Sequence, residues 1–349
     1  MAQDNSKREE LPHRLHSLLL AAIHEFIATA LPVGSHQLAM RQAVGVRSAM
    51  VRNLMAALEE AGFLIQPHTS AGRIPTERAF RYFVDHLTPP LPIAFQDRTQ
   101  IELHYSAPGS DPNGMIRDTS RLLSLMTGHT AVVIAPRLEA VRIEHVQFIR
   151  VREREVLVIF VIAAGGVQTR VVQTDRDYGQ TSLDRMADYL NESLRGRTLQ
   201  QAREWIEHQL RQEQAVYDQL RRAALRLGET IARTASSAEV YIEGSSKALE
   251  QPEFADPARM RELLRALDDK TALLDLLERS VPESGAMVSI GSENLAARLS
   301  GLSVVAAPYI SDAHPLGSLA VVGPVRMDYE RVIPLVTYTA RALSRALEH

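Results

Sequence analysis

Residues 47–53 combine basic, small and amide side chains in a pattern that can contact the edges of DNA bases. The residues that could do so are Arg47, Ser48, Ala49, Arg52 and Asn53. An arginine can donate two hydrogen bonds to guanine and an asparagine can exchange two with adenine, each pair adding about 1–3 kcal/mol of discrimination between bases. Alternatively, Arg52 and Asn53 are solvated or pair with Glu59. For the segment as a whole, the pattern favours DNA contact.

Polar and basic side chains on either side of this segment could bind phosphate oxygens. Downstream they are His68, Thr69, Ser70, Arg73 and Arg78. We expect Arg73 to be the main phosphate contact, although the same turn residues could simply stabilise their own hairpin, and Arg78 could be solvated surface. Upstream, Ser35 and His36 open a short helix whose free amides favour an anion, while plain N-capping explains Ser35 equally well.

The elements that carry these residues have the order of a winged helix-turn-helix domain. Apolar residues at helical spacing predict helices over residues 11–30, 35–42 and 48–61, with a glycine-containing turn between the second and third. Gly62 is expected to end the third helix. We expect its inward face to consist of Met50, Leu54, Ala57 and Leu58.

A compact ribbon and a fourth helix complete this predicted domain. Residues 63–65 and 73–74 are expected to pair as two strands around the turn formers PHTSAG, and Thr76 to cap a helix that runs through residue 86. In a domain of this kind the third helix enters the major groove, and the ribbon reaches phosphates or the minor groove. The sequence therefore predicts sequence-specific binding to double-stranded DNA.

Composition restricts the class of protein. The chain has 349 residues, 45% of them hydrophobic and 23% charged, which predicts several folded domains. It has no cysteine, which excludes disulfides and thiolate catalysis, and its polar start and lack of a long apolar run predict a cytoplasmic protein without a membrane segment. The net charge of −3 means that any DNA affinity must come from a local basic patch.

The remaining pattern predicts an α+β chain with an insertion. The segment TPPLP at 88–92 marks a boundary. Four strands are expected over residues 130–173, three helices with one short strand over 181–280, and further strands and a last helix after 287, which together suggest an antiparallel sheet interrupted by an insertion. The predicted division is 1–88 for the DNA-binding domain, 89–97 for a linker, 98–175 and 285–349 for two parts of one sheet domain, and 176–284 for a largely helical insertion.

An apolar heptad stripe in the expected helix over 198–233 could join two subunits. Such a stripe also packs commonly within its own domain, but two-fold protein symmetry on inverted half-sites favours a homodimer. The residues that we expect at this dimer interface are Ile206, Leu210, Tyr217, Leu220 and Leu227.

Patterns for catalysis are weak. Asp268 and Asp269 lie in a polar helical run without a nucleophile, and the segment GSSK at 244–247 lacks the glycine spacing of a phosphate-binding loop. His13 and His16 share a helical face but have no third ligand. We therefore expect neither an enzyme, nor a metal site, nor a bound cofactor.

Several blocks of sequence resemble the HrcA family of heat-inducible transcription repressors. The blocks are 32–35 (PVGS), 52–59, 67–76 (PHTSAGRIPT) and 81–85, and near the other end 290–291, 293–294 and 323–329. The resemblance covers nearly the whole chain and is thinnest over residues 175–280. The chain departs from the family pattern at Arg47, Met50 and Leu54, so its base contacts can differ.

The resemblance implies a winged-helix domain, a GAF-like domain and an inserted dimerising domain. It further implies a repressor of chaperone operons that binds an inverted-repeat, CIRCE-type operator as a homodimer, is inactivated by heat and is kept folded by a GroEL-type chaperonin. Two alternatives remain open from the sequence: a small-molecule-responsive regulator that holds a ligand in its GAF-like domain, and an interaction scaffold whose winged helix binds protein.

Overall fold

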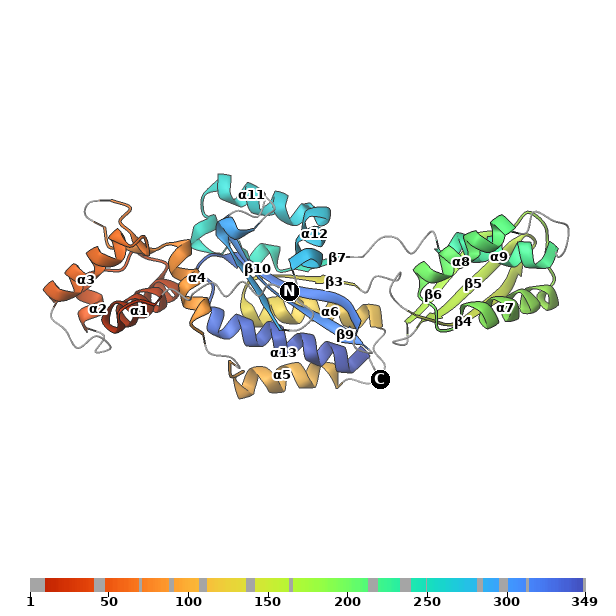
Figure 1. Cartoon of the computed structure of the whole chain (residues 1–349), viewed down its shortest axis with the longest axis horizontal. Coiled ribbons are helices and arrows are strands. Elements are labelled where there is room, and N and C mark those ends of the chain that lie inside the picture. Colours follow the sequence, from red (N-terminus) through yellow and green to blue (C-terminus); the bar gives the residue numbers. More distant parts are fainter. Residues whose placement is uncertain are drawn as a thin grey trace.

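The computed structural model describes residues 10–40, 48–68, 71–87, 91–106, 112–135, 142–162, 166–212, 219–232, 240–248, 250–280, 285–294, 301–311 and 314–347. Three bodies follow one another along the long axis of the molecule (Figure 1). A helical N-terminal domain lies at one end, a five-stranded sheet with its helices lies in the centre, and a smaller body with a three-stranded sheet lies at the other end. The chain is therefore α+β with antiparallel sheets, as expected.

The described part of the N-terminal domain contains four helices and one short ribbon. Its elements are α1 (His13–Thr29), α2 (Ser35–Met40), α3 (Ser48–Glu60), β1 (Leu64–Ile65), β2 (Ile74–Pro75) and α4 (Glu77–Asp85). Gly62 follows α3 with a positive φ of 77°, which a side chain would disfavour, and the Thr76 hydroxyl accepts a hydrogen bond from the Ala79 amide at the start of α4. The expected order of elements is confirmed.

Two local predictions for this domain need correction. The inward side of α3 is formed by Val51, Met55 and Leu58, with Leu54 packed partly against the same cluster. Leu58 and Leu54 are thus placed as expected, whereas Met50 is 37% exposed and the expectation missed Val51 and Met55. All of these residues are apolar and lie at helical spacing from one another, so periodicity alone could not select the full set. At α2, the Gly34 carbonyl accepts the first helical hydrogen bond from the Leu38 amide, so Ser35 belongs to the first turn and is not the cap.

The central sheet has the strand order β7-β3-β10-β9-β8, with every neighbouring pair antiparallel. The strands are β3 (Thr130–Ile134), β7 (Val240–Glu243), β8 (Met287–Ile290), β9 (Leu302–Ser311) and β10 (His314–Pro324). Both faces are covered, because Val133, Val305 and Val321 belong to one apolar cluster and Val132, Val304 and Ala320 belong to another. Alternating residues of each strand thus fill two cores.

Helices form a layer on each side of this sheet (Figure 1). On the face of Val133 lie α6 (Pro112–Thr127) and α13 (Tyr329–Leu347), and α5 (Phe95–Tyr105) packs against these two helices. On the opposite face lie α11 (Pro257–Asp268) and α12 (Lys270–Ser280), preceded by α10 (Ser245–Ala248) and the short 3-10 helix η3 (Pro252–Phe254); a second 3-10 helix, η4 (Gly291–Glu293), follows β8. Since α5 starts at Phe95, part of the expected linker over 89–97 is helical.

The third body is a separate unit with its own core. It consists of β4 (Ile143–Arg152), β5 (Glu155–Ile162), β6 (Gly166–Gln173), α7 (Gln180–Leu194), α8 (Leu199–Gln212) and α9 (Gln219–Ala232). Strands β4–β6 pair only with one another among the described strands, so the expectation that residues 143–173 share a sheet with the later strands is wrong. Conversely, β7, α11 and α12 belong to the central domain. The insertion therefore begins after β3 and is a mixed α/β unit.

Candidate nucleic-acid interface

The first half of α3 presents an exposed polar face. Ala49, Arg52 and Asn53 are exposed, Met50 is partly so, and Ser48 is half-buried at the helix start. Because Val51, Met55 and Leu58 anchor the opposite side, the orientation of this face is fixed by packing. Helices α2 and α3 lie at the end of the molecule away from the central sheet (Figure 1), so the described part of the chain leaves this face open to a partner.

The start of α2 offers a smaller polar surface beside α3. His36 is exposed and Ser35 is half-buried. The Gln37 side-chain oxygen accepts a hydrogen bond from the Gly34 amide at 3.0 Å, so one of the amides that could have bound an anion is already used. The expected anion site at Ser35 and His36 is correspondingly reduced to the imidazole and the remaining amides.

Arg73 has a structural role that the sequence did not indicate. Its Nε lies 2.8 Å from Oε2 of Glu59, and its side chain is only 16% exposed. Its amide and carbonyl pair with the carbonyl and amide of Val33, at 2.9 and 2.8 Å. Arg73 therefore ties the ribbon to α3 and to the connection after α1. The prediction that it is the main phosphate contact does not fit this arrangement.

Arg78 is also committed to the protein, although it is exposed. It donates a hydrogen bond to the Ala61 carbonyl at 2.8 Å, and its guanidinium lies 4.7 Å from the centre of the Phe63 ring. A cation in this position satisfies the negative end of α3. Phosphate contact by Arg78 would therefore compete with a helix-capping interaction.

The ribbon presents His68 at the surface. The Ala71 amide donates to the His68 carbonyl at 2.9 Å, and the Gln66 side chain donates to the Ala71 carbonyl at 3.0 Å. These bonds hold the turn closed while the His68 side chain stays exposed. Arg47 and Ser70, which were expected to contact DNA, lie outside the described residues.

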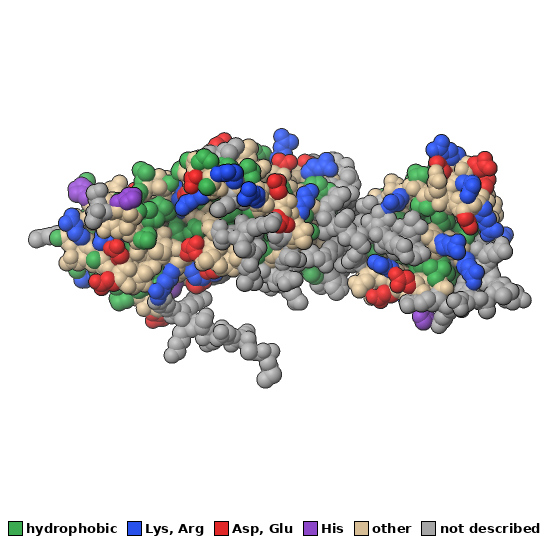
Figure 2. Space-filling view, turned by 90° about the horizontal axis from the view of Figure 1, so that it is seen from above, with side chains coloured by type: hydrophobic (Ala, Val, Ile, Leu, Met, Phe, Trp, Pro, Cys, Tyr) green, Lys and Arg blue, Asp and Glu red, His purple; other side chains and the backbone are tan. Residues whose placement is uncertain are grey.

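Among the described residues of this surface, a single arginine carries a free positive charge. Among the described arginines of α3, the ribbon and α4, Arg73 and Arg78 are engaged as above, and Arg81 lies 3.2 Å from the Glu293 carboxylate. Arg52 has no ion pair with any described residue and is exposed. Acidic, basic and histidine side chains are mixed at this end of the molecule (Figure 2). Any DNA affinity of the described surface must therefore depend strongly on Arg52.

The side of the N-terminal domain opposite to α3 is docked on the central domain. Oε2 of Glu77 accepts hydrogen bonds from the amide and the hydroxyl of Ser292, at 2.9 and 2.6 Å. The rings of Phe80 and Tyr329 are 6.1 Å apart, and His24 lies 3.3 Å from Glu330. Apolar residues of both domains belong to one continuous cluster. The two domains are thus joined by a packed and polar junction.

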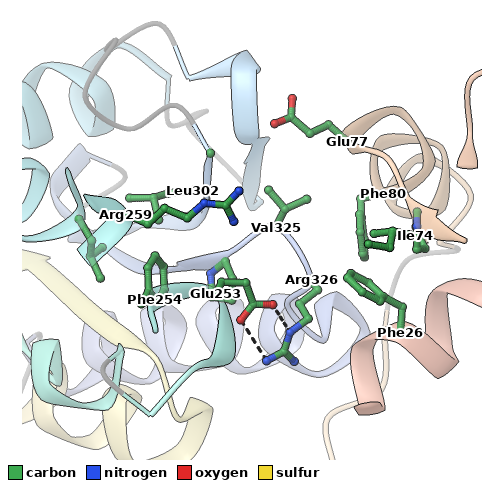
Figure 3. A pocket seen from close by; sticks show the side chains of 14 residues that line it. Phe26, Ile74, Glu77, Phe80, Glu253, Phe254, Arg259, Leu302, Val325 and Arg326 are labelled. Atoms are coloured by element: carbon green, nitrogen blue, oxygen red, sulfur yellow. Dashed lines mark hydrogen bonds and ion pairs between the residues drawn. The ribbon is translucent and has the colours of Figure 1, made fainter. Parts of the chain in front are cut away.

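Arg326 is the central polar residue of this junction. It donates to the carbonyl of Ile27 in α1 at 3.1 Å and to the side chain of Gln251 at 3.0 Å, and it pairs with Glu253 (Figure 3). Reasoning from spacing did not identify the residues of this junction. The signal was nevertheless present, because Gly291, Glu293, Arg326 and Tyr329 lie in the blocks that carry the family resemblance.

The expected heptad interface is folded into the third body. Ile206 and Leu227 are buried, Leu210 packs partly against the same core, and a Cβ at Gly228 would lie 3.0 Å from the Ile206 side chain. Helices α8 and α9 therefore pack on each other within one chain, and the described part of this stripe is not available to a second subunit. Tyr217 and the side chain of Leu220 lie outside the described residues.

The helices of the third body cover one face of its three-stranded sheet, and the described residues leave the opposite face uncovered. Val151, Val167 and Val171 are each more than half exposed. On β5, Leu157 and Ile159 are only half-buried, and they alternate with buried residues that face the helices. In a sheet with one solvated face, that face normally carries polar side chains. We call this surface, formed by Ile149, Val151, Leu157, Ile159, Val161, Val167 and Val171, the open sheet face.

Neither a metal site nor a membrane-spanning helix is found in the described part of the chain. No three His, Asp or Glu side chains there are grouped so as to hold a metal ion. Among the described helices, none combines the length and apolarity needed to cross a bilayer.

Comparisons with known proteins identify the family. The family model for the HrcA protein C terminal domain matches residues 113–333. The heat-inducible transcription repressor HrcA of Geobacter sulfurreducens is 41% identical over 97% of this chain and 99% of its own length, and that of Syntrophobacter fumaroxidans is 38% identical over 97% and 98%. A solved crystal structure described as a hypothetical protein has the same overall fold, with a TM-score of 0.63 at 24% identity, over 97% of this chain and 98% of that one. The chain therefore belongs to the HrcA family of heat-inducible transcription repressors.

Proposed function

We propose that this chain is a heat-inducible transcription repressor that binds double-stranded operator DNA through the exposed face of α3. The N-terminal domain has the element order of a winged helix, and the central domain has the layered antiparallel sheet expected of a GAF-like domain. The observation that carries the proposal is the open face of α3, with Arg52 and Asn53 exposed side by side. The relatives are named heat-inducible transcription repressors, which supports a role in repression during the heat-shock response.

In this proposal Arg52 and Asn53 contact base edges and the surrounding groups bind phosphate. An exposed arginine without an ion-pair partner breaks no strong intramolecular contact when it binds DNA, and its paired N–H donors match the two acceptors of guanine. His36 from α2 and His68 from the ribbon are also exposed, and in this proposal they contact phosphates. Since the described part of the binding surface has few free cations, we expect sequence-specific contacts to supply much of its operator affinity.

We further propose that the repressor is a homodimer joined through the open sheet face. One row of this face is apolar across all three strands, because Ile149 lies opposite Leu157 and Leu157 lies opposite Val171. In the next row Ile159 lies between Gln147 and Thr169. Neither of these two rows contains a charged side chain. A second copy of the same surface is its natural cover, because a two-fold dimer places identical patches against each other and aligns two α3 helices on inverted half-sites.

Loss of the folded dimer would release the operator on heating. Domains are held by only about 5–15 kcal/mol, so a modest rise in temperature can change the active fraction strongly. In this proposal a GroEL-type chaperonin maintains the fold of the repressor. Repression of chaperone operons would then depend on how much chaperonin is not occupied by other unfolded proteins. The protein would act in the cytoplasm and would have no catalytic activity.

The proposal is tested by binding to the promoters of chaperone operons. Purified full-length protein is titrated onto a labelled promoter fragment and onto a shuffled fragment of equal length, at several salt concentrations, with and without chaperonin. Preference for the promoter, and a larger active fraction with chaperonin, are expected. Equal affinity for both fragments would refute the proposal, and binding that is insensitive to salt would indicate a protein-binding module instead.

A further inference from the structure

A cavity of about 340 Å³ lies at the junction of the N-terminal and central domains. Phe26 of α1 and Phe80 of α4 approach it from one domain, and Phe254, Leu302 and Val325 approach it from the other (Figure 3). Its size falls within the range of roughly 300–1,000 Å³ that is typical of small-molecule sites. Because each domain supplies only part of the wall, an occupant would contact both.

Four charged side chains line this cavity, and three of them have partners. Arg326 and Glu253 are paired with each other, and Glu77 accepts two hydrogen bonds from Ser292. Arg259 of α11 has no hydrogen bond or ion pair with any described residue. Its side chain is exposed and lines the cavity, with the guanidinium extending toward Val325 (Figure 3). The uncommitted charge in the cavity is therefore positive, and it stands beside aromatic and aliphatic walls.

We propose that this cavity binds a small organic carboxylate that carries an apolar ring or chain. Arg259 would bind the carboxylate, since a guanidinium and a carboxylate form two parallel hydrogen bonds. The rings of Phe26, Phe80 and Phe254 would cover the apolar part. This site goes beyond the repressor function proposed above, and it differs from a ligand site enclosed between the central sheet and its helices.

Occupancy of the cavity would hold the N-terminal domain in the arrangement described here. A ligand that binds only the docked arrangement stabilises it by mass action. Arg326 lines the same cavity and donates to the Ile27 carbonyl, so the occupant would also lie next to the main polar link between the domains. The position of α3 relative to the rest of the chain, and hence operator binding, would then depend on the ligand.

The test uses calorimetry on the full-length protein with hydrocinnamate as the probe and hydrocinnamyl alcohol as its neutral counterpart. We expect hydrocinnamate to bind and the alcohol to bind at least about tenfold more weakly, because the alcohol cannot pair with the guanidinium. Arg259→Gln should weaken hydrocinnamate by about tenfold, and Val325→Phe should abolish binding by filling the cavity. Arg265→Gln is the matched control, since Arg265 is exposed on the same helix but does not line the cavity.

Each other outcome overturns the proposal. Absence of hydrocinnamate binding to the folded wild-type protein, equal binding of the alcohol, or binding that survives both cavity variants would each refute the assigned site. A second measurement compares operator affinity with and without saturating hydrocinnamate, and an unchanged affinity would refute the coupling. The calorimetric arm contains no DNA, so failure of the repressor proposal would leave its result intact.

Discussion

Replacement of Arg73 by glutamine is expected to reduce stability and to leave the salt dependence of DNA binding unchanged. The ion pair between Arg73 and Glu59 is 2.8 Å long, with side chains 16% and 35% exposed. Exposed pairs contribute about 0–1 kcal/mol, and removal of one partner from a buried pair costs about 3–5 kcal/mol. For this partly buried pair we expect a loss of about 1–2 kcal/mol, which lowers the melting temperature by about 2–8 °C.

A double-mutant cycle separates the ion pair from other effects of the substitution. Thermal melts followed by circular dichroism are compared for wild type, Arg73→Gln, Glu59→Gln and the double variant, and a coupling energy of about 1–2 kcal/mol is expected. Operator binding is measured in parallel as a function of salt, since each phosphate contact adds about 0.9 to the slope.

Arg52→Gln is the matched control, because Arg52 is exposed and has no ion pair with a described residue. It should melt like the wild type and should bind the operator about 5- to 150-fold more weakly, which corresponds to the loss of one base contact. The reasoning would be refuted if Arg73→Gln melted normally and lowered the salt slope by about one. Arg73 would then contact phosphate, and its pair with Glu59 would be incidental.

Three further substitutions test the other surfaces. Val171→Glu on the open sheet face should give a monomer in light scattering and should lose operator binding. Arg170→Glu alters the opposite face of the same strand, so this control should remain dimeric. A dimeric Val171→Glu variant would contradict the assigned interface. Gly291→Ala would push a methyl group into the Glu77 carboxylate, so we expect it to destabilise the chain by about 1–3 kcal/mol more than Gly301→Ala does. Gly301 is the control because its backbone is also left-handed but a Cβ there would meet open space. Equal melting temperatures of the two variants would show that the junction tolerates the change. Burial, with a contribution from the positive charge of Arg326, lowers the pKa of His129 to about 4. Below its ordinary pKa of about 6.5, protonation therefore favours the unfolded chain, and the free energy of unfolding should fall by up to about 1.4 kcal/mol for each pH unit between 6.5 and 4. His129→Gln should remove this slope, and an unchanged slope would exclude His129 as its source.

The N-terminal domain could be predicted from sequence because its signals are local. Gly62, Thr76 and the turn formers of the ribbon each act on their immediate neighbours, and the element order followed from them. The role of Arg73 could not be predicted, since its partner Glu59 belongs to another element and either residue alone resembles a solvated charge. The inward side of α3 was predicted only in part, at Leu54 and Leu58, because apolar residues also occupy the neighbouring stripe.

Contacts between distant segments were beyond local reasoning. Strands over residues 143–173 were expected as strands, but alternation within a strand does not identify its partner, and these strands pair among themselves. Glu77 meets Ser292 from 215 positions away. The heptad stripe of Ile206 and Leu227 fitted a dimer seam and a folded helical pair equally well, and packing against α7 decided for the latter.

The attachment of the third body has one more consequence. Ile134, the last residue of β3, stands directly opposite Val240, the first residue of β7, in adjacent antiparallel strands. The chain thus departs from and returns to the central sheet at a single hairpin position, where a two-residue turn would suffice to close the gap. The whole intervening module is consequently dispensable for the connectivity of that sheet, and a shortened chain that bridges Ile134 to Val240 would keep the docked DNA-binding end on an unaltered scaffold.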